Sequence, residues 1–433
     1  MAIRNFDALP YDLDELVIDS ADDFRVNGLM YTDPRIFEIE MDRIFGRSWV
    51  YVAHESEIPG VFDYKTTTIG LRPVIVSRAE NGDIHVLLNR CRHRGSVVCR
   101  FETGNAQFHS CRYHGWTYGA DGALVSVPQA DAYPRSFDKK RFGLMRVPRV
   151  TNYRGLIFAS MAEDGPSFVE YLGPARRFLD YQLDHAPSGE IVLNRGAHRT
   201  EYRGNWKFQI ENSTDGYHGN TVHESFWKIM HEFGNRGGQH GNYAATDIKK
   251  ILKRRDSGFV YGFEGGHALL EYPLPETGLD TKAPGPQGDY LRALEAKHGR
   301  ATLDKIMPQY NLTIFPNVGI LLDQIRVVRP IAPDRTEVTI QLYDLDGAPE
   351  AVNRQRFEGY ERFFGPASFG SPDDVEMFAI NQTGLQAKEV TWLLLSRGLE
   401  RETVDGEGIR IGHVTDETPQ RAFHRAWKRA MAA

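Results

Sequence analysis

Residues 91–116 read CRHRGSVVCRFETGNAQFHSCRYHGW, and this stretch decides how the rest of the chain is interpreted. It holds two Cys/His pairs, Cys91 with His93 and Cys111 with His114, on two short segments with a loop between them. Zinc sites built from two cysteines and two histidines usually place like residues together. Here each segment contributes one residue of each kind. The stretch therefore predicts a metal centre that two loops hold from opposite sides.

A Rieske [2Fe-2S] cluster requires this pairing, because two thiolates hold one iron and two imidazoles hold the other. The flanking residues agree with that interpretation. Gly95 and Gly115 lack side chains, so the backbone can approach the sulfides and donate hydrogen bonds. Trp116 can shield the cluster from water. The third cysteine, Cys99, has no such pairing and is expected to be a buried, unligated thiol.

The surrounding sequence is rich in β-forming residues and turns. Asn81-Gly82 and Asp121-Gly122 are hairpin signals between β-rich runs, and further runs follow at residues 144–147 and 155–159. We expect a compact antiparallel β domain over residues 48–160. A chain of 433 residues exceeds the size at which one core stops growing, so a second domain is expected.

The rest of the chain has a mixed pattern. Residues 1–47 are expected to form a mostly helical lead-in that belongs to the catalytic domain, with a helix start at Asp33-Pro34. Residues 161–433 are expected to form the catalytic domain itself. The patterns favour helices at 167–181 and 421–431, strands at 312–315, 319–328 and 337–343, and a Gly- and Pro-rich lid or insertion over 235–290.

A second metal site is indicated by His218 and His223, which lie in a polar segment. A spacing of five does not suit a straight α-helix, so a bend or helix end is expected near Gly219. Two histidines and one carboxylate form the ligand set of non-haem Fe(II) oxygenases. Residues 373–374 are the candidate acidic pair. Asp215 lies one helical turn before His218 and is expected to accept a hydrogen bond from a histidine.

Residues 91–95 and 111–116 resemble the two cluster loops of the large subunits of Rieske ring-hydroxylating oxygenases. Residues 215–223 match the family pattern Asp-x2-His-x4-His, and FGPA at 364–367 matches the segment before the distant acidic ligand. The resemblance implies that Cys91 and Cys111 bind one iron of the cluster, and His93 and His114 the other. It implies a mononuclear iron held by His218, His223 and Asp374, with Asp373 as the alternative. It also implies that Asp215 bridges towards a cluster histidine of a neighbouring subunit and forms the electron path.

The fold implied by this resemblance is α+β. An antiparallel β Rieske domain is inserted in a helix-grip-like catalytic domain, in which helices cover an antiparallel sheet. The implied activity is that of a terminal oxygenase, which uses O2 and NADH-derived electrons to convert an aromatic substrate to a cis-dihydrodiol. The chain is more similar to the benzoate and terephthalate branch, whose substrates are aryl carboxylates.

Two other functions remain open from the sequence. A Rieske monooxygenase, acting as a hydroxylase or demethylase, would use the same metals. An electron carrier would need only residues 48–160 and would leave His218, His223 and Asp374 without a role. Arg326, Arg329 and Arg421 are possible partners for a substrate carboxylate, although a structural or surface role is favoured for each.

The expected partners follow from what the sequence lacks. No flavin or nicotinamide fingerprint is present, so a separate reductase is expected, with or without a ferredoxin. The resemblance implies a trimer, with or without a small β subunit. The net charge of -6 gives no sign of nucleic-acid binding. Three cysteines, no secretion signal and no membrane-length apolar run predict a cytoplasmic protein.

Overall fold

The computed structural model describes residues 11–235, 253, 255–321, 323–368 and 370–432, and it divides the chain into two compact units. One unit combines Met1–Ile44 with Val169–Ala433, and the other is Phe45–Phe168. The sequence predicted these divisions at 47/48 and 160/161. The aromatic ring of Phe168 stacks on Phe158 and meets Trp49 edge-on, which explains why the β unit extends to Phe168.

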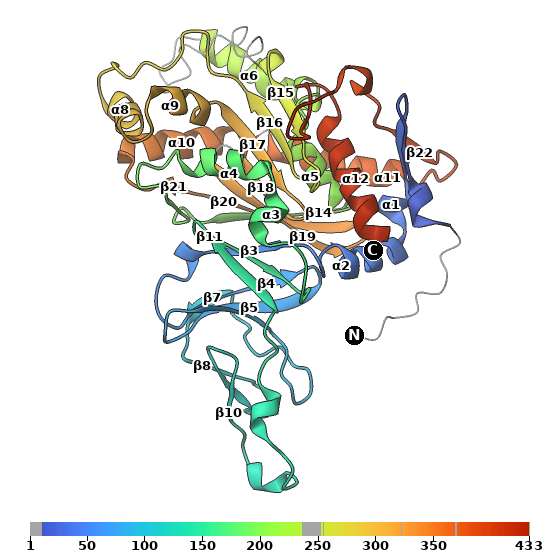
Figure 1. The fold of residues 1–433 in the computed structure, drawn as a ribbon, viewed down its shortest axis with the longest axis vertical. Helices are drawn as coiled ribbons and strands as arrows, with labels where there is room; N and C mark the ends of the chain where they lie inside the picture. Colours follow the sequence, from blue (N-terminus) through green and yellow to red (C-terminus); the bar gives the residue numbers. More distant parts are fainter. Residues whose placement is uncertain (1–10, 236–252, 254, 322, 369, 433) are drawn as a thin grey trace. The chain divides into compact units, whose positions relative to one another are not determined.

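The unit of Phe45–Phe168 is built from three small antiparallel sheets (Figure 1). The strand orders are β6-β5-β4-β7, β10-β9-β8 and β11-β12-β3. Its strands are β3 (Val50–His54), β4 (Asp63–Ile69), β5 (Arg72–Arg78), β6 (Ile84–Leu88), β7 (Thr103–Asn105), β8 (Phe108–Ser110), β9 (Thr117–Gly119), β10 (Leu124–Ser126), β11 (Arg149–Tyr153) and β12 (Leu156–Ser160).

Both predicted hairpins are confirmed. Gly82 lies between β5 and β6 with φ +87°, and Gly122 lies between β9 and β10 with φ +88°, a region that favours glycine. The strand predicted at 144–147 was wrong. That segment makes only an isolated bridge, Leu87 to Arg146, because it runs beside β6 for too few residues to form a ladder.

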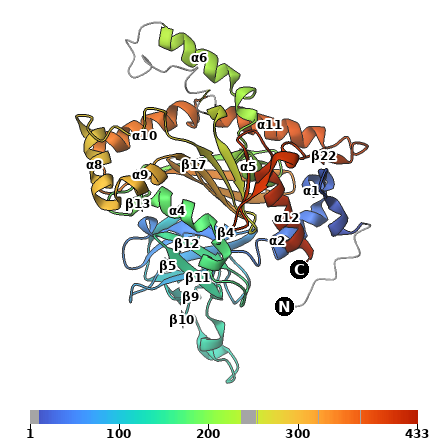
Figure 2. The same ribbon diagram turned by 45° about the horizontal axis from the view of Figure 1, so that its top comes forward.

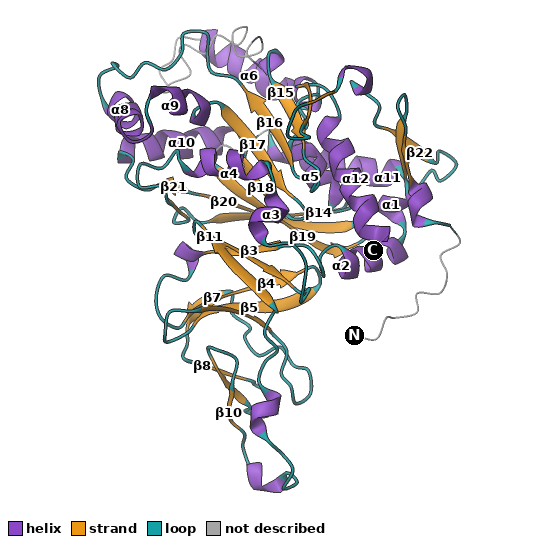
Figure 3. Cartoon of the chain, viewed as in Figure 1, coloured by secondary structure: helices purple, strands orange, loops and turns teal. Residues whose placement is uncertain are grey.

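The other unit is organised around a nine-stranded antiparallel sheet with the order β14-β20-β19-β18-β17-β16-β15-β24-β23 (Figure 3). A three-stranded sheet, β1-β2-β22, and the pair β13-β21 complete its strands among the described residues. The bounds are β1 (Val17–Asp19), β2 (Phe24–Asn27), β13 (Ile191–Val192), β14 (Ala197–Tyr202), β15 (Phe259–Gly262), β16 (Ala268–Tyr272), β17 (Gln309–Ile314), β18 (Val318–Leu321), β19 (Gln324–Ala332), β20 (Arg335–Leu342), β21 (Asp344–Leu345), β22 (Trp392–Leu394), β23 (Thr403–Val404) and β24 (Arg410–His413).

Helices cover this sheet, which confirms the predicted α+β class. Helix α12 packs on β15 and β16, α5 packs on β17 and β18, and α11 packs on the edge strand β14. Figure 2 shows α10 and α11 following one another beside the sheet. The bounds are α1 (Leu29–Thr32), α2 (Pro34–Arg43), α3 (Phe168–Leu172), α4 (Ala175–Leu183), α5 (Lys207–Ser213), α6 (Glu224–Asn235), α8 (Pro286–His298), α9 (Arg300–Ile306), α10 (Glu350–Phe363), α11 (Ser371–Gly384) and α12 (Thr418–Ala432).

Three local predictions for this unit need correction. The lead-in contains the β1–β2 hairpin as well as helices, although α2 does start at Pro34 with Asp33 as its cap. The helix predicted at 167–181 is two helices, because the chain turns at Gly173 with φ +51° before Pro174. The predicted lid at 235–290 contains β15, β16 and the start of α8, while 236–252 and 254 lie outside the described residues.

None of the described helices combines the length and the apolar character that a bilayer crossing requires.

Candidate metal centres

The two Cys/His loops of the β unit share one backbone pattern. The Cys91 N–H donates to the Ser96 carbonyl (2.8 Å), and the Gly95 N–H donates back to the Cys91 carbonyl (3.0 Å). The second loop repeats this, with Cys111 N to Trp116 O at 2.8 Å and Gly115 N to Cys111 O at 2.9 Å. Both glycines have positive φ, +79° and +71°, as such tight turns require. The two loops therefore share one turn, in which the histidine follows its cysteine by two residues in the first loop and by three in the second.

The four predicted cluster residues lie together in this unit. The Cys91 and Cys111 thiols are unbridged and buried in one core cluster with Trp116 and Tyr118. The ring centroids of His93 and His114 are 4.5 Å apart. Trp116 stacks on His93, with centroids 5.1 Å apart and planes 8° apart, as expected for a residue that shields the site.

One unused polar atom and one thiol contact indicate that these loops hold an inorganic group. His93 Nδ1 is buried without a hydrogen-bond partner in the part of the chain that the structure describes. Cys91 Sγ lies 3.2 Å from the Tyr118 hydroxyl, whose oxygen accepts the Arg92 N–H at 3.0 Å. That geometry leaves the hydroxyl proton free to point at the sulfur. Two thiols, two imidazoles and an orphaned ring nitrogen fit a Rieske cluster.

The second site is built where α5 ends and α6 begins. Between them the chain turns through a short 3₁₀ helix, His218–Asn220, which separates His218 from His223. This is the helix end that the spacing of five required. Asp215 Oδ1 accepts the backbone N–H groups of Tyr217 (2.6 Å) and His218 (3.3 Å), so Asp215 fixes the turn that carries His218.

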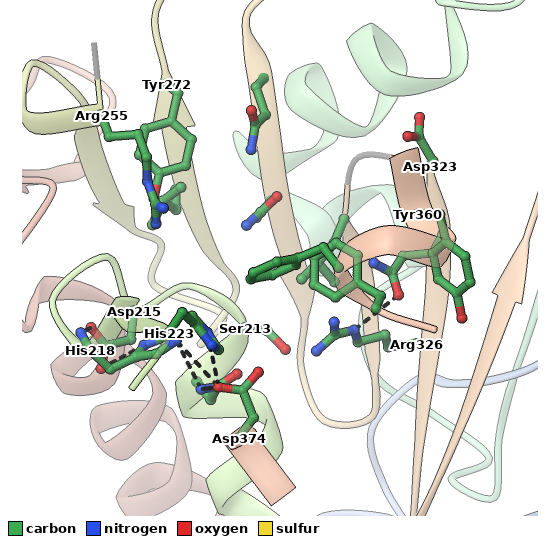
Figure 4. Close-up of a pocket in the computed structure, with 18 of the residues that line it drawn as sticks. Ser213, Asp215, His218, His223, Arg255, Tyr272, Asp323, Arg326, Tyr360 and Asp374 are labelled. Carbon is green, nitrogen blue, oxygen red and sulfur yellow. Dashed lines mark hydrogen bonds and ion pairs between the residues drawn. The ribbon is translucent and has the colours of Figure 1, made fainter. Parts of the chain in front are cut away.

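Asp374, in the first turn of α11, completes a compact group with the two histidines (Figure 4). Its Oδ1 lies 3.5 Å from His218 Nε2 and 3.4 Å from His223 Nε2. One donor atom from each residue lies within 4.8 Å of the others. Two imidazoles and one carboxylate suit Fe(II), and a facial set of this kind leaves coordination positions open. Of the described residues, these three alone form such a group of potential metal ligands.

Asp373 lies differently. Its Oδ2 is 4.0 Å from His223 Nδ1, the nitrogen that does not face Asp374, and its side chain is 30% exposed. It also accepts a long hydrogen bond from the Ser225 hydroxyl, at 3.4 Å. Between the two acidic candidates, the geometry favours Asp374.

Neighbouring charges shift the pKa values of Asp374 and His218. Burial would raise the pKa of the Asp374 carboxyl, but His223, His218 and Arg326 outweigh it and lower that pKa. Burial likewise opposes protonation of His218, but Asp215 and Asp374 raise its pKa. Asp215 Oδ2 lies 3.5 Å from His218 Nδ1, an ion-pair distance that is longer than an ordinary hydrogen bond.

One residue at this site had no predicted role. The Asn212 side-chain nitrogen donates to Asp374 Oδ1 at 3.1 Å and lies 3.3 Å from His218 Nε2. Asn212 and Asp374 are 162 residues apart in the chain, so no local pattern could pair them.

The three ligand candidates form part of the wall of a cavity of about 360 Å³, near the lower end of the ~300–1,000 Å³ typical of small-molecule sites. The same cavity is lined by aromatic side chains and by a buried arginine. These residues are Phe226, Trp227, Tyr272, Tyr360, Phe363, Phe364 and Arg326.

Two further histidines and the three candidate arginines differ in their partners. His267 and His413 are hydrogen-bonded to backbone groups, as expected for structural histidines. Arg329 pairs with Glu337, and Arg421 pairs with Glu402. Of the three arginines proposed for a substrate carboxylate, only Arg326 lines the cavity.

Two protein families match this chain, one over each of the two candidate metal sites. The family described as "Ring hydroxylating alpha subunit (catalytic domain)" matches residues 190–433, and "Rieske [2Fe-2S] domain" matches residues 48–149. The chain belongs to the ring-hydroxylating alpha subunits, the Rieske non-haem iron oxygenases that act on aromatic rings. The cofactors expected from the sequence, a [2Fe-2S] cluster and a non-haem iron used with O2 and with NADH through a reductase, are those of this family.

Individual relatives place the chain within the family. It is 38% identical to the 2-halobenzoate 1,2-dioxygenase large subunit of Burkholderia cepacia, over 87% of this chain and 80% of the relative. It is 37% identical to the toluate 1,2-dioxygenase subunit alpha of Pseudomonas putida, over 83% of this chain and 79% of the relative. The solved structure of naphthalene 1,2-dioxygenase with indole bound superposes with a TM-score of 0.84 at 26% identity, covering 98% of this chain and 95% of that one. The predicted benzoate-type branch is confirmed.

Proposed function

We propose that this terminal oxygenase cis-dihydroxylates a small aryl carboxylate, with its iron held by His218, His223 and Asp374. The observation that carries the proposal is the compact group of two imidazoles and one buried carboxylate on the wall of a largely aromatic cavity. Relatives that act on 2-halobenzoate and toluate support the substrate class. In the same proposal Cys91, His93, Cys111 and His114 hold the cluster.

The chain's own residues prepare this site. When bound, Fe(II) supplies open coordination positions at which O2 can react beside the substrate. Asn212 and His223 fix the carboxylate of Asp374 from two directions. Phe226 and Phe363, whose rings meet edge-on at 4.8 Å, offer an apolar wall for a flat ring and limit the access of water.

The wider assembly is part of the proposal. Residues 48–160 carry the cluster, and 1–47 with 161–433 carry the iron site. Asp215 acts as the electron bridge through its contact with His218, towards the cluster of a neighbouring subunit in a trimer. A β subunit can be present or absent, and electrons arrive from a reductase with or without a ferredoxin. The cytoplasmic location stays a prediction.

The test compares Asp374→Ala with its neighbour Asp373→Ala in the purified holoenzyme. We expect Asp374→Ala to lose mononuclear iron and turnover while the Rieske absorption persists, and Asp373→Ala to keep its iron. The opposite result would identify Asp373, and not Asp374, as the iron ligand. Turnover under 18O2 then separates dioxygenation, with two labelled oxygens in the product, from monooxygenation, with one.

A further inference from the structure

Arg326 is a buried cation in the wall of the iron-site cavity. It lies on β19, and the residue is 2% exposed. Its Nε donates to the Gln324 side-chain oxygen at 3.2 Å. Its Nη2 is buried and has no hydrogen-bond partner among the described residues. The Arg326 guanidinium therefore keeps one buried nitrogen, Nη2, whose hydrogen bonds no described residue accepts.

Two other arginines of this unit, Arg329 and Arg356, are neutralised within the protein. Arg329 makes a two-point contact with Glu337, at 2.8 and 2.6 Å. Arg356 pairs with Asp323 at 2.7 Å, which also removes Asp323 as a counter-charge for Arg326. No carboxylate oxygen of the described residues comes within the 4.0 Å of an ion pair with Arg326. Asp374 acts on Arg326 electrostatically from beyond that distance. Burying a charge without a direct partner is costly, so the guanidinium is suited to bind a further anion.

The neighbours of Arg326 extend this anion site. Gln324 is two residues earlier on the same strand, so both side chains leave the same face of the sheet. The Gln324 Nε2 is a second buried donor without a partner in the described structure. The Arg326 guanidinium lies 4.7 Å from the centroid of the Phe364 ring. Two unused donors therefore stand beside an aromatic wall.

A second cation in the cavity is already engaged. Arg255 donates to the Tyr272 hydroxyl at 3.1 Å and lies over the rings of Trp227 and Tyr272. It is only half-buried, unlike Arg326. Figure 4 shows Arg255 beside Tyr272, on the far side of the drawn residues from Arg326 and Tyr360.

We propose that Arg326, together with Gln324, binds the carboxylate of a one-ring aryl carboxylate and so selects anionic arenes over neutral ones. The inference rests on the proposed function of the cavity and names the residue that sets its specificity. A guanidinium can hold a carboxylate through two parallel hydrogen bonds, and Gln324 Nε2 can supply a third. The ring of such a ligand would then lie along the aromatic wall that continues towards His223 and Asp374.

The test measures binding rather than turnover, by calorimetry on the oxygen-free holoenzyme. The probes are benzoate and nitrobenzene, which have similar planar shapes but differ in charge. Four proteins are compared: the wild type, Arg326→Gln, Arg326→Lys and the control Arg329→Gln. The control removes the same charge from the same strand, at a residue outside the cavity. Iron content is measured for each protein.

We expect the wild type and Arg329→Gln to bind benzoate at least about thirtyfold more tightly than nitrobenzene, the effect of losing one buried charge partner. Arg326→Gln should lose that preference while its nitrobenzene affinity stays within about threefold, and Arg326→Lys should recover part of it. Equal affinities of the wild type for the two probes would overturn the inference, and this comparison needs no variant. The inference would also be overturned if Arg326→Gln bound benzoate as tightly as the wild type does. Either result with iron in place would leave the proposed oxygenase site intact.

Discussion

A hydrogen bond joins the side chains of Asn212 and Asp374, with Nδ2 3.1 Å from Oδ1. It connects the end of α5 to the first turn of α11, the two elements that bring the ligand candidates together. The same amide lies 3.3 Å from His218 Nε2. Asn212 is thus a positioning residue that sets how the carboxylate and one imidazole face each other.

Asn212→Leu should therefore weaken iron binding without removing a ligand. Polar groups that orient metal ligands are typically worth about 10–100-fold in metal affinity, and we expect a loss of that size. Competition against a chelator, followed by iron analysis, measures it. Asn311→Leu is the matched control, since Asn311 lines the same cavity from β17. Equal iron retention in both variants would contradict the role given to Asn212.

The Tyr118 hydroxyl is expected to raise the reduction potential of the cluster. It lies 3.2 Å from Cys91 Sγ, and hydrogen bonds to sulfur ligands stabilise the reduced, more negative state. Tyr118→Phe removes the bond and keeps the ring, so the potential should fall by about 60 mV, equivalent to roughly 1.4 kcal/mol for one electron. Redox titration followed by EPR measures the shift.

A control for this prediction lies in the same core. Tyr133→Phe removes a hydroxyl from an aromatic residue that packs on Trp116. We expect its potential to match the wild type. A Tyr118→Phe potential that also matches would show that the hydroxyl does not act on the cluster.

The sequence located sites whose residues are close together in the chain. Cys91 with His93, and Cys111 with His114, sit on tight loops whose conformation follows from local hydrogen bonds and glycines. His218 begins the short 3₁₀ helix and His223 directly precedes α6, so one turn of the chain carries both. The acidic pair 373–374 was a candidate from the sequence itself, but the choice of Asp374 came from the family resemblance, because its approach to the histidines depends on how α11 packs.

Other features depended on long-range packing and escaped prediction. The pairing of Asn212 with Asp374 is one example. Arg326 is another, since the sequence could not distinguish it from Arg329, three residues later on the same strand. Only the structure shows that Glu337 pairs with Arg329 and that no carboxylate in the described part of the chain forms an ion pair with Arg326. The β1–β2 hairpin was missed because its strands are short and complete their sheet with β22, far along the chain.

Stability at mildly acidic pH should depend on His267. Its ring is fully buried, donating from Nε2 to the Tyr171 carbonyl (2.8 Å) and accepting the Phe315 N–H at Nδ1 (3.1 Å). Burial lowers the pKa of His267 to about 4, from 6.5, despite the opposing effect of the Tyr171 carbonyl. Between these values the unfolded chain binds a proton that the folded chain does not. Stability should therefore fall as pH drops from 6.5 to 4, by up to about 3 kcal/mol from this residue.

The measurement is the urea midpoint of the wild type and of His267→Gln at pH 7 and pH 5. The variant should be less stable at pH 7, because it loses a well-packed hydrogen-bonding group, but its midpoint should fall less between the two pH values. Parallel losses in the two proteins would mean that other groups account for the acid sensitivity.

Asp215 is the residue whose role depends most on assembly. It accepts two backbone N–H groups at the turn before His218, and its second oxygen lies 3.5 Å from the His218 ring. The first contacts fix the turn, and an asparagine could replace them since Asn caps about as well as Asp. The contact with His218 is electrostatic, and only a carboxylate provides it.

Asp215→Asn separates these two roles. If Asp215 carries electrons between a cluster and the iron of the next subunit, the variant should keep both metal sites and its oligomeric state but transfer electrons very slowly. The reason is that the amide cannot stabilise a protonated or polarised histidine as the carboxylate does. Single-turnover kinetics of the pre-reduced enzyme, followed through the Rieske absorption, measure this directly. The wild type should oxidise its cluster rapidly when substrate and O2 are mixed in, and the variant should not. Oxidation of the variant cluster at the wild-type rate would leave Asp215 as a turn-forming residue only, because its backbone contacts would then account for everything it does.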